Sequence, residues 1–156
     1  MPASVIASER IGSRLFVKAY DHDPGATTAV LASPDGGTTI RFLDMRDYEY
    51  FGVMARPTIV GGTGLTKLEI VMSATTAFSS VAVVKDSGAV AGDSLNDVVF
   101  LECSAEEVAQ QATDDGVAYR YVAARLTMGT GTDEANVSYT AIPKRPVTGL
   151  TATAIT

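Results

Sequence analysis

The fold class is decided by the stretch LTKLEIVMSA, residues 65–74. Leu68, Ile70 and Met72 occupy every second position, and the residues between them are mostly polar. Because successive side chains of a β-strand point to opposite faces, this alternation predicts a strand with one buried and one exposed face. The stretch therefore indicates a sheet that packs on an apolar core.

A glycine-rich turn precedes this strand. GGTG at residues 61–64 follows YEYFGVMAR at residues 48–56, which is rich in aromatic and β-forming residues and predicts a long, largely buried strand. Pro57 is expected to restrict the end of that strand, because proline has no backbone N–H to donate. Two strand patterns joined by a glycine-rich turn predict an antiparallel hairpin.

Further strand patterns occur along the rest of the chain, separated by Gly, Pro and Asp turns. Strands are predicted at residues 13–20, 27–32, 38–43, 81–84, 97–103, 117–128 and 135–142. Strands and helices do not alternate in this pattern, so a parallel α/β fold is not expected. The chain is predicted to be all-β, a β-sandwich or jelly roll of about eight strands with one short helix.

The predicted helix has clear start and stop signals. Ser104-Ala105-Glu106-Glu107 has the Ser-x-x-Glu form of a capping box, in which the serine and the glutamate each bond the other's backbone N–H. Residues 108–112 can complete about two turns before Asp114-Asp115-Gly116 ends the helix. A helix this short is expected to bridge two strands rather than to form a layer.

The chain of 156 residues fits one domain. Weak periodicity predicts that residues 1–12 form an N-terminal arm and residues 13–142 the β-sandwich domain. Residues 143–156 are predicted to be a C-terminal tail, because two prolines at its start stop strand pairing. With 46% hydrophobic residues, the chain has enough apolar surface to form a core rather than stay disordered.

Charge and apolar patterning exclude two classes of partner. The formal net charge of −6 argues against binding to a phosphate backbone, so no nucleic acid is expected. No apolar run approaches the roughly 18 residues needed to cross a bilayer, and no secretory signal is recognisable. We therefore expect no membrane partner and synthesis in a cytoplasm. Residues 86–116 hold eight acids and no Lys or Arg, which predicts a solvated face or one that meets a basic partner.

Cys103 is the only cysteine and His22 the only histidine. An intrachain disulfide, a cysteine-built zinc site and a multi-histidine metal site are therefore not possible, and most nucleophilic triads lack their base. The segment Asp21-His22-Asp23-Pro24-Gly25 is predicted to be a turn rather than a metal cluster. We expect no catalytic residues, no cofactor and no metal.

Two motifs superficially suggest chemistry. Residues 61–67 resemble a phosphate-binding loop, but the spacing before the lysine is wrong and a strand follows instead of a helix. Paired carboxylates at Glu106-Glu107 and Asp114-Asp115 leave a carboxylate-based hydrolase as an alternative. The simpler interpretation is that Glu107 caps the helix and that Asp114-Asp115-Gly116 forms a turn.

Two blocks carry a resemblance to a known class of protein. FLDMRDYEYFGV at residues 42–53 and YRYVAAR at residues 119–125 lie in an acidic β chain rich in Ala, Thr, Gly and Val. In this overall character, over residues 40–142, the chain resembles the small structural proteins of tailed-phage virions, which include β-rich capsid decoration (cement) proteins. The resemblance implies a non-enzymatic protein at the capsid surface of a virion, a homotrimer that bridges copies of the major capsid protein.

The two chain ends are mildly basic and unpatterned, so they are the predicted contact segments for the capsid and for sister copies. The candidate contact residues are Val5, Ile6, Arg10, Ile11, Arg14, Lys144, Arg145 and Leu150. The alternative interpretation is a glycan-binding or tail-associated β-sandwich module, in which tyrosines such as Tyr119 would contact the ligand.

Overall fold

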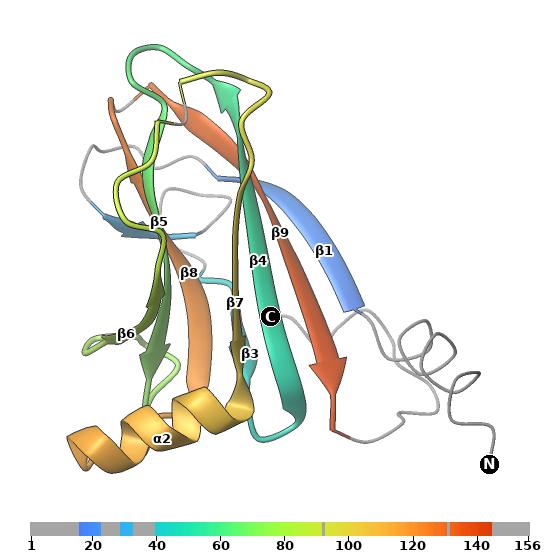
Figure 1. Ribbon diagram of the computed structural model, residues 1–156, viewed down its shortest axis with the longest axis vertical. Helices are drawn as coiled ribbons and strands as arrows, with labels where there is room; N and C mark the ends of the chain where they lie inside the picture. Colours follow the sequence, from blue (N-terminus) through green and yellow to red (C-terminus); the bar gives the residue numbers. More distant parts are fainter. Residues whose placement is uncertain (1–15, 23–28, 33–39, 92, 131, 145–156) are drawn as a thin grey trace, which may run out of the picture.

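The computed structural model describes residues 16–22, 29–32, 40–91, 93–130 and 132–144 (Figure 1). These residues form nine strands and one helix, arranged as two antiparallel sheets with the helix across one end. The predicted arm at residues 1–12 and residues 145–156 of the predicted tail lie outside the described residues. The predicted start of the tail at residue 143 is wrong, because Pro143 is the last residue of β9 and pairs with Tyr48. The all-β class with one short helix is confirmed.

Sheet A contains the strands of both chain ends and two central ones, in the order β1-β9-β4-β7. Its members are β1 (Phe16–His22), β9 (Glu134–Pro143), β4 (Tyr48–Ile59) and β7 (Val99–Ser104). Sheet B has the order β2-β8-β5-β6, and β3 also pairs with β8. Its members are β2 (Val30–Leu31), β8 (Tyr121–Met128), β5 (Leu65–Ser73), β6 (Ala82–Asp86) and β3 (Phe42–Asp44).

The path of the chain through the sheets is that of a jelly roll. Because β2 and β3 both pair with β8, they act as one interrupted edge strand of sheet B. With these two counted as one strand, the chain crosses to the opposite sheet at every connection except β5 to β6. Two antiparallel four-stranded sheets connected in this way define the jelly-roll form of the β-sandwich.

The predicted hairpin between residues 48–56 and 65–74 is wrong. Strand β4 bonds to β7 and β9 in sheet A, whereas β5 bonds to β6 and β8 in sheet B. Each strand turns an apolar face inward, represented by Val53 on β4 and Ile70 on β5, so the two strands face each other across the core. A two-residue period shows that one face of a strand is buried. It does not show whether the next strand is hydrogen-bonded beside it in the same sheet or packs against it from the opposite sheet.

Pro57 does not end β4, which continues to Ile59. The pairing of β4 with β7 stops at Ala55, so Pro57 has only β9 as a partner, at Ala135. Because β7 does not pair with β4 at Pro57, the missing N–H of the proline interrupts no hydrogen bond to β7. A strand tolerates proline at a position that lacks a neighbour on one side.

The core fills the space between the sheets, and the Tyr139 side chain joins them. Tyr139 is fully buried on β9 of sheet A, and its ring packs edge-on against Phe51 with 5.0 Å between the ring centroids. Its hydroxyl accepts a hydrogen bond from the backbone N–H of Ala124 at 3.2 Å and donates one to the carbonyl of Arg41 at 3.1 Å. Tyr139 thus packs its apolar ring in the core, and its hydroxyl hydrogen-bonds the backbone of sheet B at Ala124.

Helix α2 (Ala105–Asp115) connects β7 of sheet A to β8 of sheet B and lies across the lower end of the sandwich in Figure 1. The predicted capping box is confirmed, since Ser104 accepts from the Glu107 N–H and the Glu107 side chain accepts from the Ser104 N–H. Gly116 ends the helix in the left-handed conformation with φ 66°. Val108 is the buried residue through which α2 seals the core.

Candidate interaction surface

Of the predicted contact residues, only Lys144 is among the described ones. It follows the last residue of β9, is exposed, and belongs to a pocket described below. The other seven lie outside the described residues: Val5, Ile6, Arg10, Ile11, Arg14, Arg145 and Leu150.

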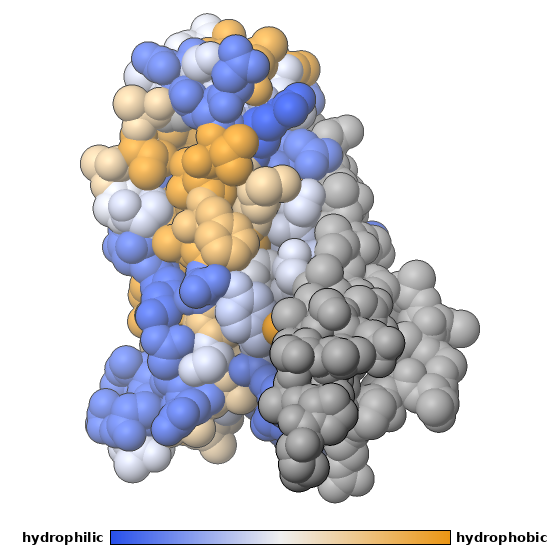
Figure 2. Space-filling view, turned by 45° about the vertical axis from the view of Figure 1, so that its right-hand side comes forward, coloured by the Kyte–Doolittle hydropathy of each residue, from blue (hydrophilic) through white to orange (hydrophobic). Residues whose placement is uncertain are grey.

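The outward side of β4 and β7, here termed the β4–β7 face, exposes large apolar side chains. Met54 is paired directly across the strands with Phe100, and their exposed fractions are 39% and 51%. Val98, two positions before Phe100, is 54% exposed. Ile59 at the end of β4 and Leu95 in the connection that leads into β7 are also exposed. Figure 2 shows an apolar area with hydrophilic side chains around it.

A second feature of this face is an aromatic pair over a glycine. Gly52 leaves room on β4, and a Cβ at that position would lie 3.3 Å from the rings of both Tyr50 and Phe100. The Tyr50 hydroxyl donates a hydrogen bond to the carboxylate of Glu102. Burial and this bond raise the pKa of Tyr50 above its ordinary value. Two rings and a carboxylate therefore lie together on the outer face of sheet A.

Sequence reasoning missed the β4–β7 face because it treated residues 48–56 as largely buried. In the structure the inward positions of β4 are buried, but Glu49, Met54 and Arg56 are exposed. Arg56, two positions after Met54 on the same side of the strand, is the available signal that this side of β4 faces outward, whereas Glu49 lies at a register shift near the start of β4. The pairing of Met54 with Phe100 joins strands that are far apart in sequence, so no local pattern reveals it.

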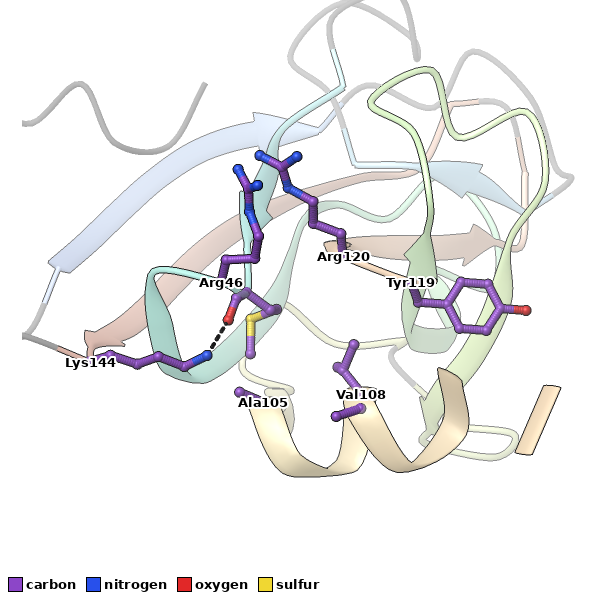
Figure 3. A pocket seen from close by; sticks show the side chains of 8 residues that line it. Arg46, Ala105, Val108, Tyr119, Arg120 and Lys144 are labelled. Carbon is purple, nitrogen blue, oxygen red and sulfur yellow. Dashed lines mark hydrogen bonds between the residues drawn. The ribbon is translucent and has the colours of Figure 1, made fainter. Parts of the chain in front are cut away.

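A pocket of about 170 Å³, here termed the α2 pocket, lies between α2 and the ends of the sheets (Figure 3). Its apolar wall consists of Met45, Ala105, Val108 and Ala109. Tyr119 lines the same pocket, in a segment that was predicted to start a strand at residue 117. Strand β8 begins instead at residue 121, because the N–H of residue 117 bonds back to the helix and the chain has yet to enter the sheet.

The rest of the lining comes from Arg46, Arg120 and Lys144, and the guanidinium groups of the two arginines point away from α2 (Figure 3). The carboxylate of Asp44 pairs with Arg46 at 3.0 Å and also with Arg120. The ammonium of Lys144 donates to the carbonyl of Met45 at 2.9 Å, the bond drawn in Figure 3. No carboxylate of the described residues pairs with Lys144, so the pocket has an excess of positive charge in an acidic chain.

The glycine-rich loop after β4 binds an internal carboxylate instead of a phosphate. Asp133 is fully buried, and its side chain accepts backbone hydrogen bonds at 2.6, 2.9, 3.1 and 2.7 Å from Gly61, Gly62, Gly64 and Thr130. Burial alone would raise the pKa of Asp133, but these donors outweigh it and hold the pKa below its ordinary value. The N–H groups of the loop are therefore already used, and a strand follows it, as predicted.

Three of the four paired carboxylates have structural partners. Glu107 completes the capping box and bonds Lys85, and mainly that bond lowers the pKa of Glu107. Asp114 and Asp115 lie in the last turn of α2, where they accept side-chain bonds from Gln110 at 2.9 Å and Gln111 at 3.0 Å. The predicted turn at Asp114-Asp115-Gly116 is therefore the end of the helix itself.

The outer face of sheet B holds a charged network beside a small apolar cluster of Val71, Phe78 and Ala123. Glu69 is buried and its carboxylate bonds Arg125 at 2.6 Å and Lys67 at 2.9 Å, while Lys67 also pairs with Asp86 at 2.8 Å. Burial would raise the pKa of Glu69, but the bonds from Arg125 and Lys67 outweigh it and lower the pKa. The charged groups of this face are thus paired with one another.

No protein-family model matches this sequence, and no curated protein matches it. Helix α2, with 11 residues, is neither long nor apolar enough to cross a membrane, and no other helix occurs in the described ranges. The described part of the chain also holds no group of three His, Cys, Asp or Glu residues that could bind a metal ion.

Proposed function

We propose that this protein is a non-enzymatic structural component of a tailed-phage virion, which decorates and stabilises the capsid as a homotrimer that bridges major capsid proteins. The observation that carries the proposal is the β4–β7 face, where Met54 and Phe100 are paired across the strands and exposed side by side. The jelly roll is a fold that viral capsid domains use, and this agrees with the resemblance of residues 40–142.

In this proposal the β4–β7 face packs against a sister copy. A cyclic trimer needs a heterologous interface, in which the apolar face of one subunit meets a different patch of the next. Permanent interfaces bury more than about 2,000 Å² and have an apolar centre. Met54 and Phe100, which are adjacent and apolar, are suited to that centre. The predicted arm and tail then contact the shell, and many weak contacts on one particle act together to reinforce it.

Size-exclusion chromatography with light scattering tests the trimer. The expected mass is three times that of the chain, and Phe100→Ser is expected to shift the protein to monomer, because it removes apolar surface from the centre of the interface. Val117→Ser is the matched control, since Val117 is exposed but lies after α2, away from this face. A wild-type protein that stays monomeric and never co-sediments with capsids of a candidate phage would overturn the proposal.

Glycan binding is a second candidate function, favoured by the aromatic pair and the Glu102 carboxylate on the same face. Exposed rings can stack on sugars, a carboxylate accepts bonds from sugar hydroxyls, and lectin domains also use jelly rolls. A glycan array that gives hits lost in Tyr50→Ala but kept in Tyr119→Ala supports this alternative. Tyr119 is the control because it lies in the α2 pocket and not on the β4–β7 face.

A further inference from the structure

The α2 pocket combines one apolar wall with an excess of positive charge. Its lining includes three of the chain's twelve basic residues and no acid, although acids outnumber bases 18 to 12 in the chain. Asp44 neutralises only part of this charge, because a single carboxylate serves both Arg46 and Arg120. The side chain of Arg46 is 62% exposed and Lys144 is exposed, so both cations can still bind an anion.

The backbone around the pocket is held in place before any ligand arrives. The Met45 N–H donates to the Arg120 carbonyl at 2.9 Å, which ties the β3–β4 turn to the segment before β8. The Lys144 N–H donates to the Asp47 carbonyl at 2.9 Å, and its ammonium uses one of three donors on Met45. A preorganised pocket loses less entropy when it binds, so even a small contact can be specific.

The size of the pocket indicates what enters it. Small-molecule sites usually span about 300–1,000 Å³, whereas this pocket holds about 170 Å³. That volume suits one aliphatic or aromatic side chain, and protein interfaces commonly seat such an anchor in a pocket of this kind. The cations beside the apolar wall then select the residues that flank the anchor.

We propose that the α2 pocket binds an acidic peptide segment of a partner protein, seating one large apolar side chain against Val108 and Ala109 while flanking carboxylates pair with Arg46 and Lys144. This site is separate from the β4–β7 face, so it does not depend on the virion role or on glycan binding.

A blocked pentapeptide with a central leucine and four aspartates is the probe, titrated into the full chain and followed by amide NMR shifts. We expect shifts at Ala105, Val108 and Ala109. Replacing the leucine by alanine is expected to weaken binding about tenfold or more, because several methyl and methylene groups are no longer buried. Replacing the aspartates by asparagines is expected to weaken it about two- to fivefold for each exposed ion pair lost.

Two variants with matched controls locate the site. Ala109→Glu places a charge and bulk at the exposed rim and is expected to abolish binding, whereas Gln110→Glu adds the same charge one position on, outside the pocket lining. Lys144→Glu is expected to weaken binding, and Arg56→Glu on the exposed side of β4 is not. Equal affinity for the leucine and alanine peptides, shifts elsewhere, no binding, or full binding by Ala109→Glu would each overturn the proposal.

Discussion

The carboxylate of Asp133 lies 2.6 Å from the backbone nitrogen of Gly61, although 72 positions separate them in sequence. Asp133 belongs to the connection between β8 and β9, and Gly61 to the connection between β4 and β5. Both connections cross from one sheet to the other. The buried aspartate therefore holds the two crossings together at one end of the sandwich, and this explains how a loop with three glycines in four residues keeps a fixed path.

Asp133→Asn is expected to lower the free energy of unfolding by about 2–4 kcal/mol, because an amide donor then faces backbone N–H groups and leaves some of them unpaired. Urea unfolding followed by circular dichroism measures the change. Asp93→Asn, at an exposed position, is the control and is expected to leave stability unchanged. Equal midpoints for the two variants would contradict the fastening role.

Acid is expected to destabilise the protein through Asp133 and Glu69. Each has a folded-state pKa below its ordinary value, so the unfolded chain takes up protons first and the stabilisation is lost as pH falls through the folded values. The contribution is complete above about pH 5 and declines below about pH 4. Unfolding free energies measured from pH 7 to pH 3 test this.

The matched variant for the acid prediction is Glu69→Gln, which removes one of the two titrating groups. Its stability is expected to be lower than that of the wild type at pH 7 and to fall less steeply toward pH 3. If the slope is the same with and without Glu69, the network with Arg125 and Lys67 does not contribute to acid sensitivity.

Cys103 is expected to resist thiol reagents in the folded state. Burial raises the pKa of Cys103 to about 12, so almost no thiolate is present at pH 8, and the sulfur faces the core. Ellman's reagent is expected to react with it only as fast as the protein opens, and immediately in urea. Rapid reaction of the native protein would show that β7 opens easily at that position.

Tyr139→Phe is expected to cost about 1–3 kcal/mol of stability, because the ring stays packed on Phe51 while the hydroxyl bonds to Ala124 and Arg41 are lost in a buried place. Thermal unfolding measures the loss. Tyr121→Phe is the control, since the Tyr121 ring packs edge-on against Phe42 on the outer side of sheet B. A loss of the same size in both variants would contradict a special role for the Tyr139 hydroxyl.

The strands and the helix could be predicted from sequence because each depends on a local signal. The period of two in residues 65–74 and the capping box at Ser104 both specify their own segment. The predicted exposed face of residues 65–74 is wrong, because Glu69, Val71 and Ser73 are buried. Strand pairing could not be predicted in the same way. The apparent hairpin between β4 and β5 is a crossing between sheets, and the Asp133 contact that holds it is distant in sequence.

The same limit applies to the candidate sites. Lys144 was selected as a contact residue for its position at the start of a tail, but its neighbours Met45 and Ala105 come from segments far from it in sequence. Met54 and Phe100 are likewise unremarkable within their own strands. Each site is formed by residues that are distant in sequence and become neighbours across paired strands or at the end of a sheet. The topology brings them together, and no local sequence pattern reveals it.

Strand β9 lies between β1 and β4 in sheet A, and Phe16 is paired with Ala141. Among the described strands, β1 comes first in the chain and pairs only with β9, which comes last, so it has no neighbour in the sheet until β9 has been made. A nascent chain can pair β5 with β6 and β4 with β7, but sheet A is complete only after synthesis has passed residue 143. Messages cut short before that point are expected to yield chains that are degraded rather than partly working proteins.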